Sequence, residues 1–226
     1  MKILAVADVE CPALWEHYVR GRLDDYDLIL GCGDLKAAYL TFLVTMSHAR
    51  LLYVPGNHDV TYPTYPPEGC EDIDCQLVSY NGVRILGLGG CLWYHEGPYQ
   101  ITEKQMKRRI SKLRRALKKA GGVDIVITHS PPRGLGDMDH PAHKGFECFR
   151  ELIDQYHPKY FIHGHTHLNY DITLPRSLTH GETQVINAYE RHELDYPVEC
   201  DRSAELIWFT KHHEDSEMLD FFRIRQ

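Results

Sequence analysis

The apolar residues of this chain gather in short runs, and five of these runs end at a residue that can bind a metal ion. The runs are KILAVA, LILGCG, LLYVPG, VDIVIT and YFIHG. They lead, in this order, to Asp8, Asp34, Asn57, His129 and His165, with His167 two residues further on. Runs of this length bounded by glycine, proline and asparagine are typical of buried parallel strands, and parallel sheets bind ligands beyond the carboxyl ends of their strands. The pattern therefore predicts that these polar residues meet at one site.

Other segments of the pattern predict a hairpin and two helices. Residues 76–80 and 83–88 flank Asn81-Gly82, which favours a type I′ turn between antiparallel strands. The segment TEKQMKRRISKLRRALKKAGG begins with a capping box, Thr102 with Gln105, and ends at two glycines. Its apolar residues recur at helical spacing, so one face is expected to pack on a sheet. A second helix is expected over about residues 145–156.

Downstream of His167 we expect four more strands, over residues 170–174, 183–187, 205–210 and 218–224. These strands are predicted to be antiparallel and to close the sheets. No linker or internal repeat divides the chain. Residues 1–226 are therefore expected to form a single α/β domain with two stacked mixed β-sheets flanked by helices.

The residues at the strand ends combine carboxylate, amide and imidazole groups, a donor set that suits divalent Mn, Fe, Zn or Mg. Six candidate ligands exceed what one tetrahedral zinc ion requires. A carboxylate can bridge two ions about 3.5–4 Å apart in a phosphatase-type centre. We therefore expect two divalent ions, with Mn as the first choice and Fe, Zn, Ni or Mg as alternatives.

The order of these motifs resembles that of the calcineurin-like metallophosphoesterases. The resemblance rests on Asp8-Val9-Glu10, Gly33-Asp34, Gly56-Asn57-His58-Asp59, Thr128-His129 and Gly164-His165-Thr166-His167. It implies an αββα sandwich in which Asp8, Asp34 and His167 bind a first ion. Asp34 would bridge to a second ion, and the further ligands of that ion would be Asn57, His129 and His165.

The resemblance also implies a hydrolytic mechanism in which metal-bound water attacks phosphorus. Asn57 and His58 would contact the phosphoester, and His58 would protonate the leaving oxygen. Asp59 is expected to orient the His58 imidazole, as carboxylates beside such groups commonly do. The alternative is that His58 and Asp59 only close the loop.

The first motif departs from the family, which has Asp-x-His where this chain has Asp8-Val9-Glu10. Glu10 either replaces the missing imidazole with a carboxylate oxygen at the first ion, or lies outside the ligand set. In the second case it would orient a ligand or occupy a helix N-terminus, where a negative side chain is favoured.

Loop residues give the hints about substrate. The segment SPPRGLGD directly after His129 resembles the corresponding stretch of phosphodiesterase-like members, and its Arg133 is a candidate substrate-binding residue. A small phosphodiester or phosphomonoester is the expected substrate. The branch that acts on phosphoproteins has Asp-Arg-Gly soon after its Gly-Asp motif; Leu35-Lys36-Ala37 follows here, which disfavours a protein phosphatase. The alternatives are a nuclease and a non-catalytic binding module that retains the fold.

The composition indicates the cellular compartment and bears on whether the protein binds nucleic acid. Seven cysteines without CxxC spacing argue against a disulfide framework, and no apolar run is long enough to span a bilayer, so a cytoplasmic protein without membrane contact is expected. The net charge of −7 opposes a general nucleic-acid binder, although residues 104–119 contain nine Lys or Arg. A solvated helix face is the default interpretation of this basic segment, and a binding surface for a polyanion is the alternative. The sequence leaves the oligomeric state open.

Overall fold

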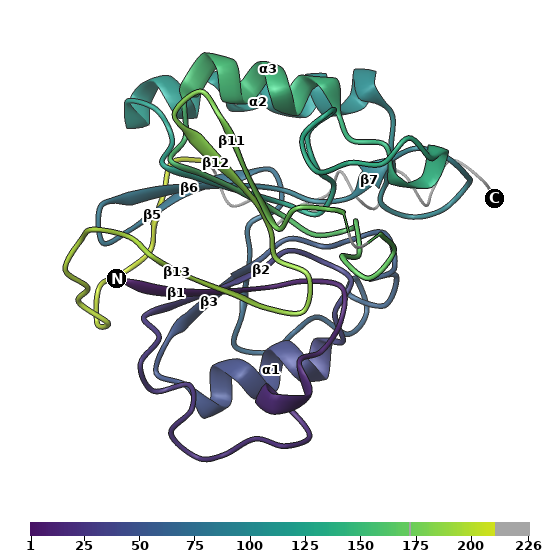
Figure 1. Ribbon diagram of the computed structural model, residues 1–226. Coiled ribbons are helices and arrows are strands. Elements are labelled where there is room, and N and C mark those ends of the chain that lie inside the picture. Colours follow the sequence, from purple (N-terminus) through teal and green to yellow (C-terminus); the bar gives the residue numbers. More distant parts are fainter. Residues whose placement is uncertain (172, 211–226) are drawn as a thin grey trace.

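The computed structural model describes residues 1–171 and 173–210 and contains two sheets packed face to face (Figure 1). The first sheet has the order β13-β1-β2-β3-β4, with bounds His192–Asp195, Lys2–Val6, Leu28–Gly31, Arg50–Tyr53 and Glu71–Asp72. The second has the order β11-β12-β10-β9-β6-β5-β14. Its bounds are Ser177–His180, Thr183–Asn187, Tyr160–His163, Ile125–Thr128, Val83–Leu88, Gln76–Tyr80 and Ile207–Trp208. A short parallel pair joins β7 (Cys91–Leu92) to β8 (Gln100–Ile101).

Helices cover the outer face of each sheet, as Figure 1 shows for α1 on one side and for α2 and α3 on the other. Their bounds are Ala37–Met46, Glu103–Ala120 and Glu147–Tyr156, and 3-10 turns cover Pro12–Leu14 and Pro141–His143. Strand alternation sends Ile3 and Ala5 of β1 into the core between the sheets, and Leu4 and Val6 toward α1. The expected sandwich of two mixed sheets flanked by helices is confirmed.

The locally encoded elements match the expectations. Asn81 and Gly82 have φ angles of 50° and 78°, as a type I′ turn requires, and β5 pairs with β6 in antiparallel register. Both hydrogen bonds of the capping box between Thr102 and Gln105 are present, and Gly121 ends α2 with a φ of 75°. Because their sequence signals lie within a few residues, these features could be predicted without knowledge of the fold.

Expectations for the last part of the chain were partly wrong. Residues 170, 171, 173 and 174 do not form a strand; Leu174 N–H donates to Asp171 O in a turn. Strand β12 is antiparallel to β11 but parallel to β10, and β14 covers only Ile207–Trp208 of the expected 205–210. The strand expected at 218–224 lies outside the described residues.

Strands β4 and β13 of the first sheet and the helix α1 that covers this sheet were not predicted from the sequence. Helix α1 has the sequence AAYLTFLVTM, which contains no charged residue and therefore no charged stripe to mark a helical period. Strand β13 contains HELD and joins the sheet beside β1, through antiparallel pairing from Lys2 with Asp195 to Ala5 with His192. Among the described residues, none of the helices has the length and apolarity that a membrane crossing requires.

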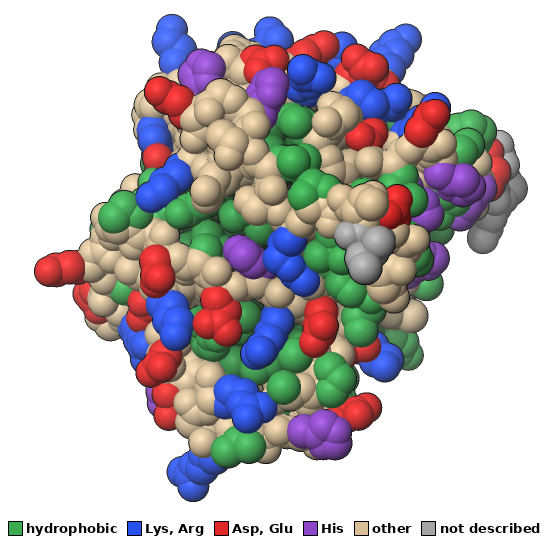
Figure 2. Space-filling view, in the orientation of Figure 1, with side chains coloured by type: hydrophobic (Ala, Val, Ile, Leu, Met, Phe, Trp, Pro, Cys, Tyr) green, Lys and Arg blue, Asp and Glu red, His purple; other side chains and the backbone are tan. Residues whose placement is uncertain are grey.

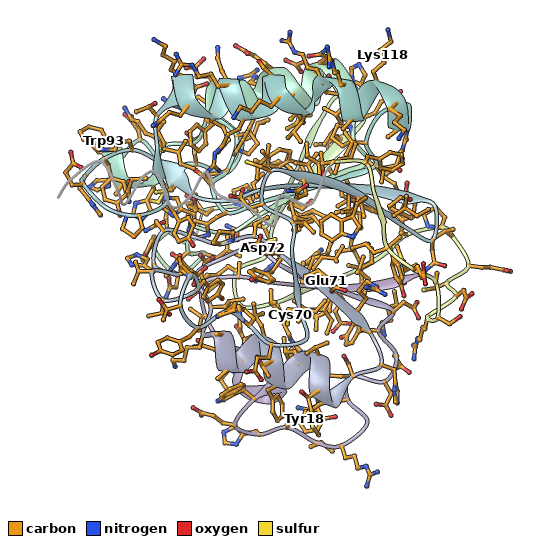
Figure 3. The ribbon with its side chains drawn as sticks, turned by 180° about the vertical axis from the view of Figure 1, so that it is seen from behind. Tyr18, Cys70, Glu71, Asp72, Trp93 and Lys118 are labelled. Carbon is orange, nitrogen blue, oxygen red and sulfur yellow. The ribbon has the colours of Figure 1, made fainter. Side chains whose placement is uncertain are left out.

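The basic residues of α2 lie on its solvent side. Figure 3 shows Lys118 on the outer face of the helix, away from the sheets. The exposed cations are Lys104, Lys107, Arg108, Lys112, Arg114, Arg115, Lys118 and Lys119. Acidic side chains lie among them over α2 and α3 (Figure 2), and Lys107 Nζ is 2.8 Å from Glu151 Oε1 on α3. This arrangement fits the default interpretation of a solvated face.

Candidate metal centre

The carboxyl ends of the strands from both sheets meet at one end of the sandwich. The N-terminus of β1 lies on the left of Figure 1, so β1 and its parallel neighbours end on the right. Cys32, just after β2 in the first sheet, accepts a hydrogen bond at its carbonyl oxygen from His129 Nδ1 of the second sheet, at 2.9 Å. The predicted convergence of the motifs is therefore seen.

Unusual backbone angles and a glycine without a Cβ atom allow the site loops to approach one another closely. Asp8, Asp34 and His165 have φ angles of 67°, 57° and 67°, a region that non-glycine residues seldom occupy. A Cβ atom on Gly56 would lie 2.1 Å from Asp34 Oδ1, so only glycine lets this loop approach the carboxylate. Such strain is characteristic of functional sites, where the surrounding structure compensates its cost.

Two buried imidazoles face each other at the centre. His165 Nδ1 lies 3.1 Å from His129 Nε2, and that same nitrogen of His129 is 3.0 Å from Asn57 Oδ1 and 3.2 Å from Asp34 Oδ2. The opposite ring nitrogens contact backbone carbonyls, which only accept: His129 Nδ1 contacts Cys32 O, and His165 Nε2 lies 2.6 Å from Ala142 O. The carbonyls thus fix both tautomers, and each ring directs its other nitrogen to a shared point.

The electrostatics of this point favour a positive charge. Burial opposes the charging of His129, but the charge and hydrogen bond of Asp34 raise the pKa of His129 to about 9. Burial likewise opposes ionisation of Asp34, yet His129 lowers the pKa of that carboxyl to about 2. Asp34 and the two imidazoles thus form a site that stabilises positive charge.

Asp8 and His167 lie beside this cluster. Asp8 Oδ1 accepts the backbone N–H of His165 at 2.8 Å, and His167 Nε2 is 4.0 Å from the same oxygen. Asp8 Oδ2 is buried and has no hydrogen-bond partner among the described residues. Burial raises the pKa of Asp8 to about 7. An unpartnered buried carboxylate oxygen is costly, and a cation would satisfy it.

The side chains of His58 and Asp59 have different partners, contrary to the expected contact in which Asp59 orients the His58 imidazole. The His58 side chain is 76% exposed, with Nε2 3.9 Å from Asp34 Oδ2. The Asp59 carboxylate accepts hydrogen bonds from the backbone N–H groups of Asp34, Gly56 and Leu35, at 2.8, 2.7 and 3.2 Å. Burial, followed by the charge of Asp34, raises the pKa of Asp59 to about 6. Asp59 thus ties two site loops together and does not hold the His58 imidazole.

Glu10 points to the start of α1. Its Oε1 accepts the backbone N–H of Lys36 at 3.1 Å, and its Oε2 lies 3.6 Å from Lys36 Nζ. The ligand atoms that lie within 4.8 Å of one another belong to Asp34, His129 and His165. Of the two expectations for Glu10, the structure favours the helix N-terminus over a place in the ligand set.

Arg133 is also used locally. Its Nε donates to Gly145 O at 3.0 Å and lies 3.4 Å from Asp137 Oδ2. The same carboxylate accepts the backbone N–H groups of Gly134 and Gly145. These contacts shape the loop after β9, and no described contact brings Arg133 to the cluster.

Sequence reasoning missed four groups at the site. The Cys32 and Ala142 carbonyls could not be identified because any residue supplies a carbonyl. The rings of Tyr170 and Tyr189 pack on His167, with centroids 4.6 and 4.9 Å from the imidazole. Tyr170 gave one usable signal, an aromatic residue three positions after a candidate ligand.

Comparisons with known proteins identify a family and a shared fold. A family model described as calcineurin-like phosphoesterase matches residues 1–169. The UPF0046 protein C25E10.12 of Caenorhabditis elegans is 23% identical over 208 residues, covering 76% of this chain and 70% of that protein. A solved crystal structure superposes with a TM-score of 0.63 at 17% identity, covering 92% of this chain and 99% of the other. The protein TT1561 of Thermus thermophilus superposes with a TM-score of 0.54 at 15% identity, covering 84% and 89%. At these identities the two superpositions establish a shared fold.

Proposed function

This chain belongs to the calcineurin-like phosphoesterase family, and we propose that it hydrolyses a small phosphodiester or phosphomonoester with two divalent ions. The observation that carries the proposal is the pair of imidazoles whose tautomers are fixed by Cys32 and Ala142. Two ring nitrogens only 3.1 Å apart repel each other unless a proton or a metal ion lies between them. A divalent cation satisfies both.

The donor groups fit two neighbouring positions. Asn57, His129 and His165 would hold one ion, a mixed nitrogen and oxygen set that suits Mn, Fe or Zn. Asp8 and His167 would hold the other, and the unpartnered Asp8 Oδ2 is the observation that supports it. Asp34 lies between these groups and would contact both ions. We propose Mn as the native metal because two carboxylates and an amide add hard oxygen donors to the imidazoles.

The chain's own residues then perform the remaining chemistry. Bound ions would supply an acidified water and would neutralise charge on the phosphoryl oxygens. The His58 side chain is 76% exposed and its Nε2 lies 3.9 Å from Asp34 Oδ2, so His58 is the residue that would donate a proton to the leaving oxygen of an ester bound at the ions. Its backbone N–H donates to Asp34 Oδ1 at 2.7 Å, which ties the loop that carries His58 to the carboxylate that would contact the ions. Asn57 is buried, and its amide oxygen lies 3.0 Å from His129 Nε2.

The seven cysteines support a reducing compartment. All are free thiols, and Cys11, Cys32, Cys91 and Cys148 are buried. A cytoplasmic location is proposed on this basis.

Metal analysis and turnover test the proposal together. Protein reconstituted with Mn²⁺ is expected to hold two ions per chain and to hydrolyse bis(p-nitrophenyl) phosphate or p-nitrophenyl phosphate. His129→Ala should lose both properties, and His48→Ala, at an exposed histidine outside the cluster, is the matched control. Absence of bound metal and of turnover under Mn, Fe, Zn, Ni and Mg would overturn the enzyme proposal. A single-stranded oligonucleotide in the same assay tests the nuclease alternative.

A further inference from the structure

His167 differs from the other two imidazoles of the centre in how its ring is held. His129 and His165 each contact a backbone carbonyl through one ring nitrogen. Within residues 1–171 and 173–210, neither ring nitrogen of His167 has a hydrogen-bond partner, and its side chain is 26% exposed. Histidines that bind metals almost always have their second nitrogen held by such a bond. Another contact must therefore fix the plane of this ring.

Two tyrosine rings contact the His167 ring: Tyr189 is tilted by 39° at 4.9 Å, and Tyr170 makes the stacked contact that sets the plane. Its ring stacks on the His167 imidazole with centroids 4.6 Å apart and planes inclined by 12°. The backbone N–H of Tyr170 donates to His167 O at 3.1 Å, so a tight turn brings the two side chains together. Behind this stack, His143 packs on Tyr170 at 5.2 Å, and His143 also contacts the His165 ring at 5.5 Å. The tyrosine is thus supported from the buried side of the centre while 51% of its surface stays exposed.

The orientation of His167 decides where its lone pair points. With the ring in its observed plane, Nε2 faces the Asp8 carboxylate at 4.0 Å, beside the unpartnered Oδ2. A rotated ring would direct Nε2 away from Asp8 and leave that position with carboxylate donors alone. Glu10 does not compensate, because its carboxylate is bonded to Lys36.

We propose that Tyr170 is a positioning residue that fixes the His167 ring and thereby sets the affinity of the metal position formed by Asp8 and His167. The proposal rests on the proposed function and concerns only one of its two ions. Stacked aromatic pairs contribute enough free energy to change a binding constant roughly 3- to 10-fold. The position with Asn57, His129 and His165 does not depend on the stack, since carbonyls hold its rings.

Calorimetric titration of metal-free protein with Mn²⁺ tests this division. Wild-type protein is expected to show two binding events. Tyr170→Ala should weaken one of them roughly 3- to 10-fold and leave the other unchanged. Tyr170→Phe, which keeps the ring and removes the hydroxyl, should restore the wild-type values. Tyr65→Ala is the matched control, because Tyr65 is 71% exposed and lies beside α1.

A merely structural role for Tyr170 gives a different result. It would lower the melting temperature of the metal-free protein or weaken both events equally, and either outcome overturns the proposal. Unchanged affinities in Tyr170→Ala, or a Tyr170→Phe variant as weak as Tyr170→Ala, would also overturn it. Absence of any Mn²⁺ binding by the wild-type protein would instead remove the proposed function, and the wild-type titration therefore separates the two failures.

Discussion

His165 Nδ1 lies 3.1 Å from His129 Nε2, and this contact joins the ends of two neighbouring parallel strands of the second sheet. Each ring is fixed from behind by a backbone carbonyl, so neither can turn away without breaking a buried hydrogen bond. The protein thus places two nitrogen atoms that can bind a metal close together before any ion is bound. The entropy cost of ordering the two rings is therefore part of folding and not of metal binding.

Asp8→Asn should separate stability from metal binding. Asparagine tolerates the left-handed backbone of this position, and it removes a buried carboxylate whose pKa is raised to about 7. The metal-free variant should therefore be about 1–2 kcal/mol more stable at pH 8, because the gain from removing the charge exceeds the cost of an unsatisfied amide. The stabilisation that Mn²⁺ adds to the wild-type protein should shrink. Denaturant unfolding with and without Mn²⁺ measures both, and a destabilised metal-free variant would contradict the prediction.

His58→Ala should affect the leaving-group step. The side chain is largely exposed, and alanine keeps the backbone N–H that donates to Asp34, so both ions should remain bound. A general acid matters most when the departing oxygen is most basic. Alkyl esters should therefore slow by roughly 10²–10⁴, whereas p-nitrophenyl esters change little. Equal slowing across a series of leaving groups would mean that His58 binds the phosphate and does not protonate the product.

Glu10→Gln should leave both Mn²⁺ affinities unchanged. The amide oxygen can still accept the Lys36 N–H, but the negative charge at the start of α1 and beside Lys36 Nζ is lost. A decrease of about 0.3–1 kcal/mol in the free energy of unfolding is expected. Calorimetry and thermal unfolding decide the matter, since a weakened ion in this variant would show that Glu10 does coordinate.

Asp124→Asn should alter stability in acid without altering the metal centre. The Asp124 carboxylate pairs with Arg84 through 2.7 and 2.8 Å contacts at the start of β9. Burial raises the pKa of Asp124, but the bonds and charge of Arg84 outweigh burial and hold it below its ordinary value of 3.8. A carboxyl with a lowered folded pKa contributes stability above that ordinary value and loses it as the pH falls through the folded value.

The variant should therefore lose roughly 1–3 kcal/mol at pH 7 and show a flatter decline between about pH 5 and pH 2. Its Mn²⁺ affinity should equal that of the wild-type protein. If the free energy of unfolding falls equally steeply between about pH 5 and pH 2 in both proteins, the Asp124–Arg84 pair does not contribute to the pH dependence of folding.

Local patterns predicted much of the fold and of the centre. The five strand-end motifs could be identified because each strand and its polar ending lie within a few residues. For the same reason Asn81-Gly82 and the pair Thr102 and Gln105 marked their turn and helix correctly. Helix α1 could not be predicted in this way, since a helix without charged residues has little periodic contrast.

The sequence by itself determined which residues could serve at a metal centre and that parallel strands would bring them to one end of the molecule. Only the tertiary structure decided what surrounds them: that Asp59 binds backbone amides, that Glu10 turns to α1, and that Tyr170 stacks on His167. The physical reason is range. Strand and turn preferences arise from neighbouring residues, whereas the partner of a carboxylate or a ring depends on which distant segment packs beside it.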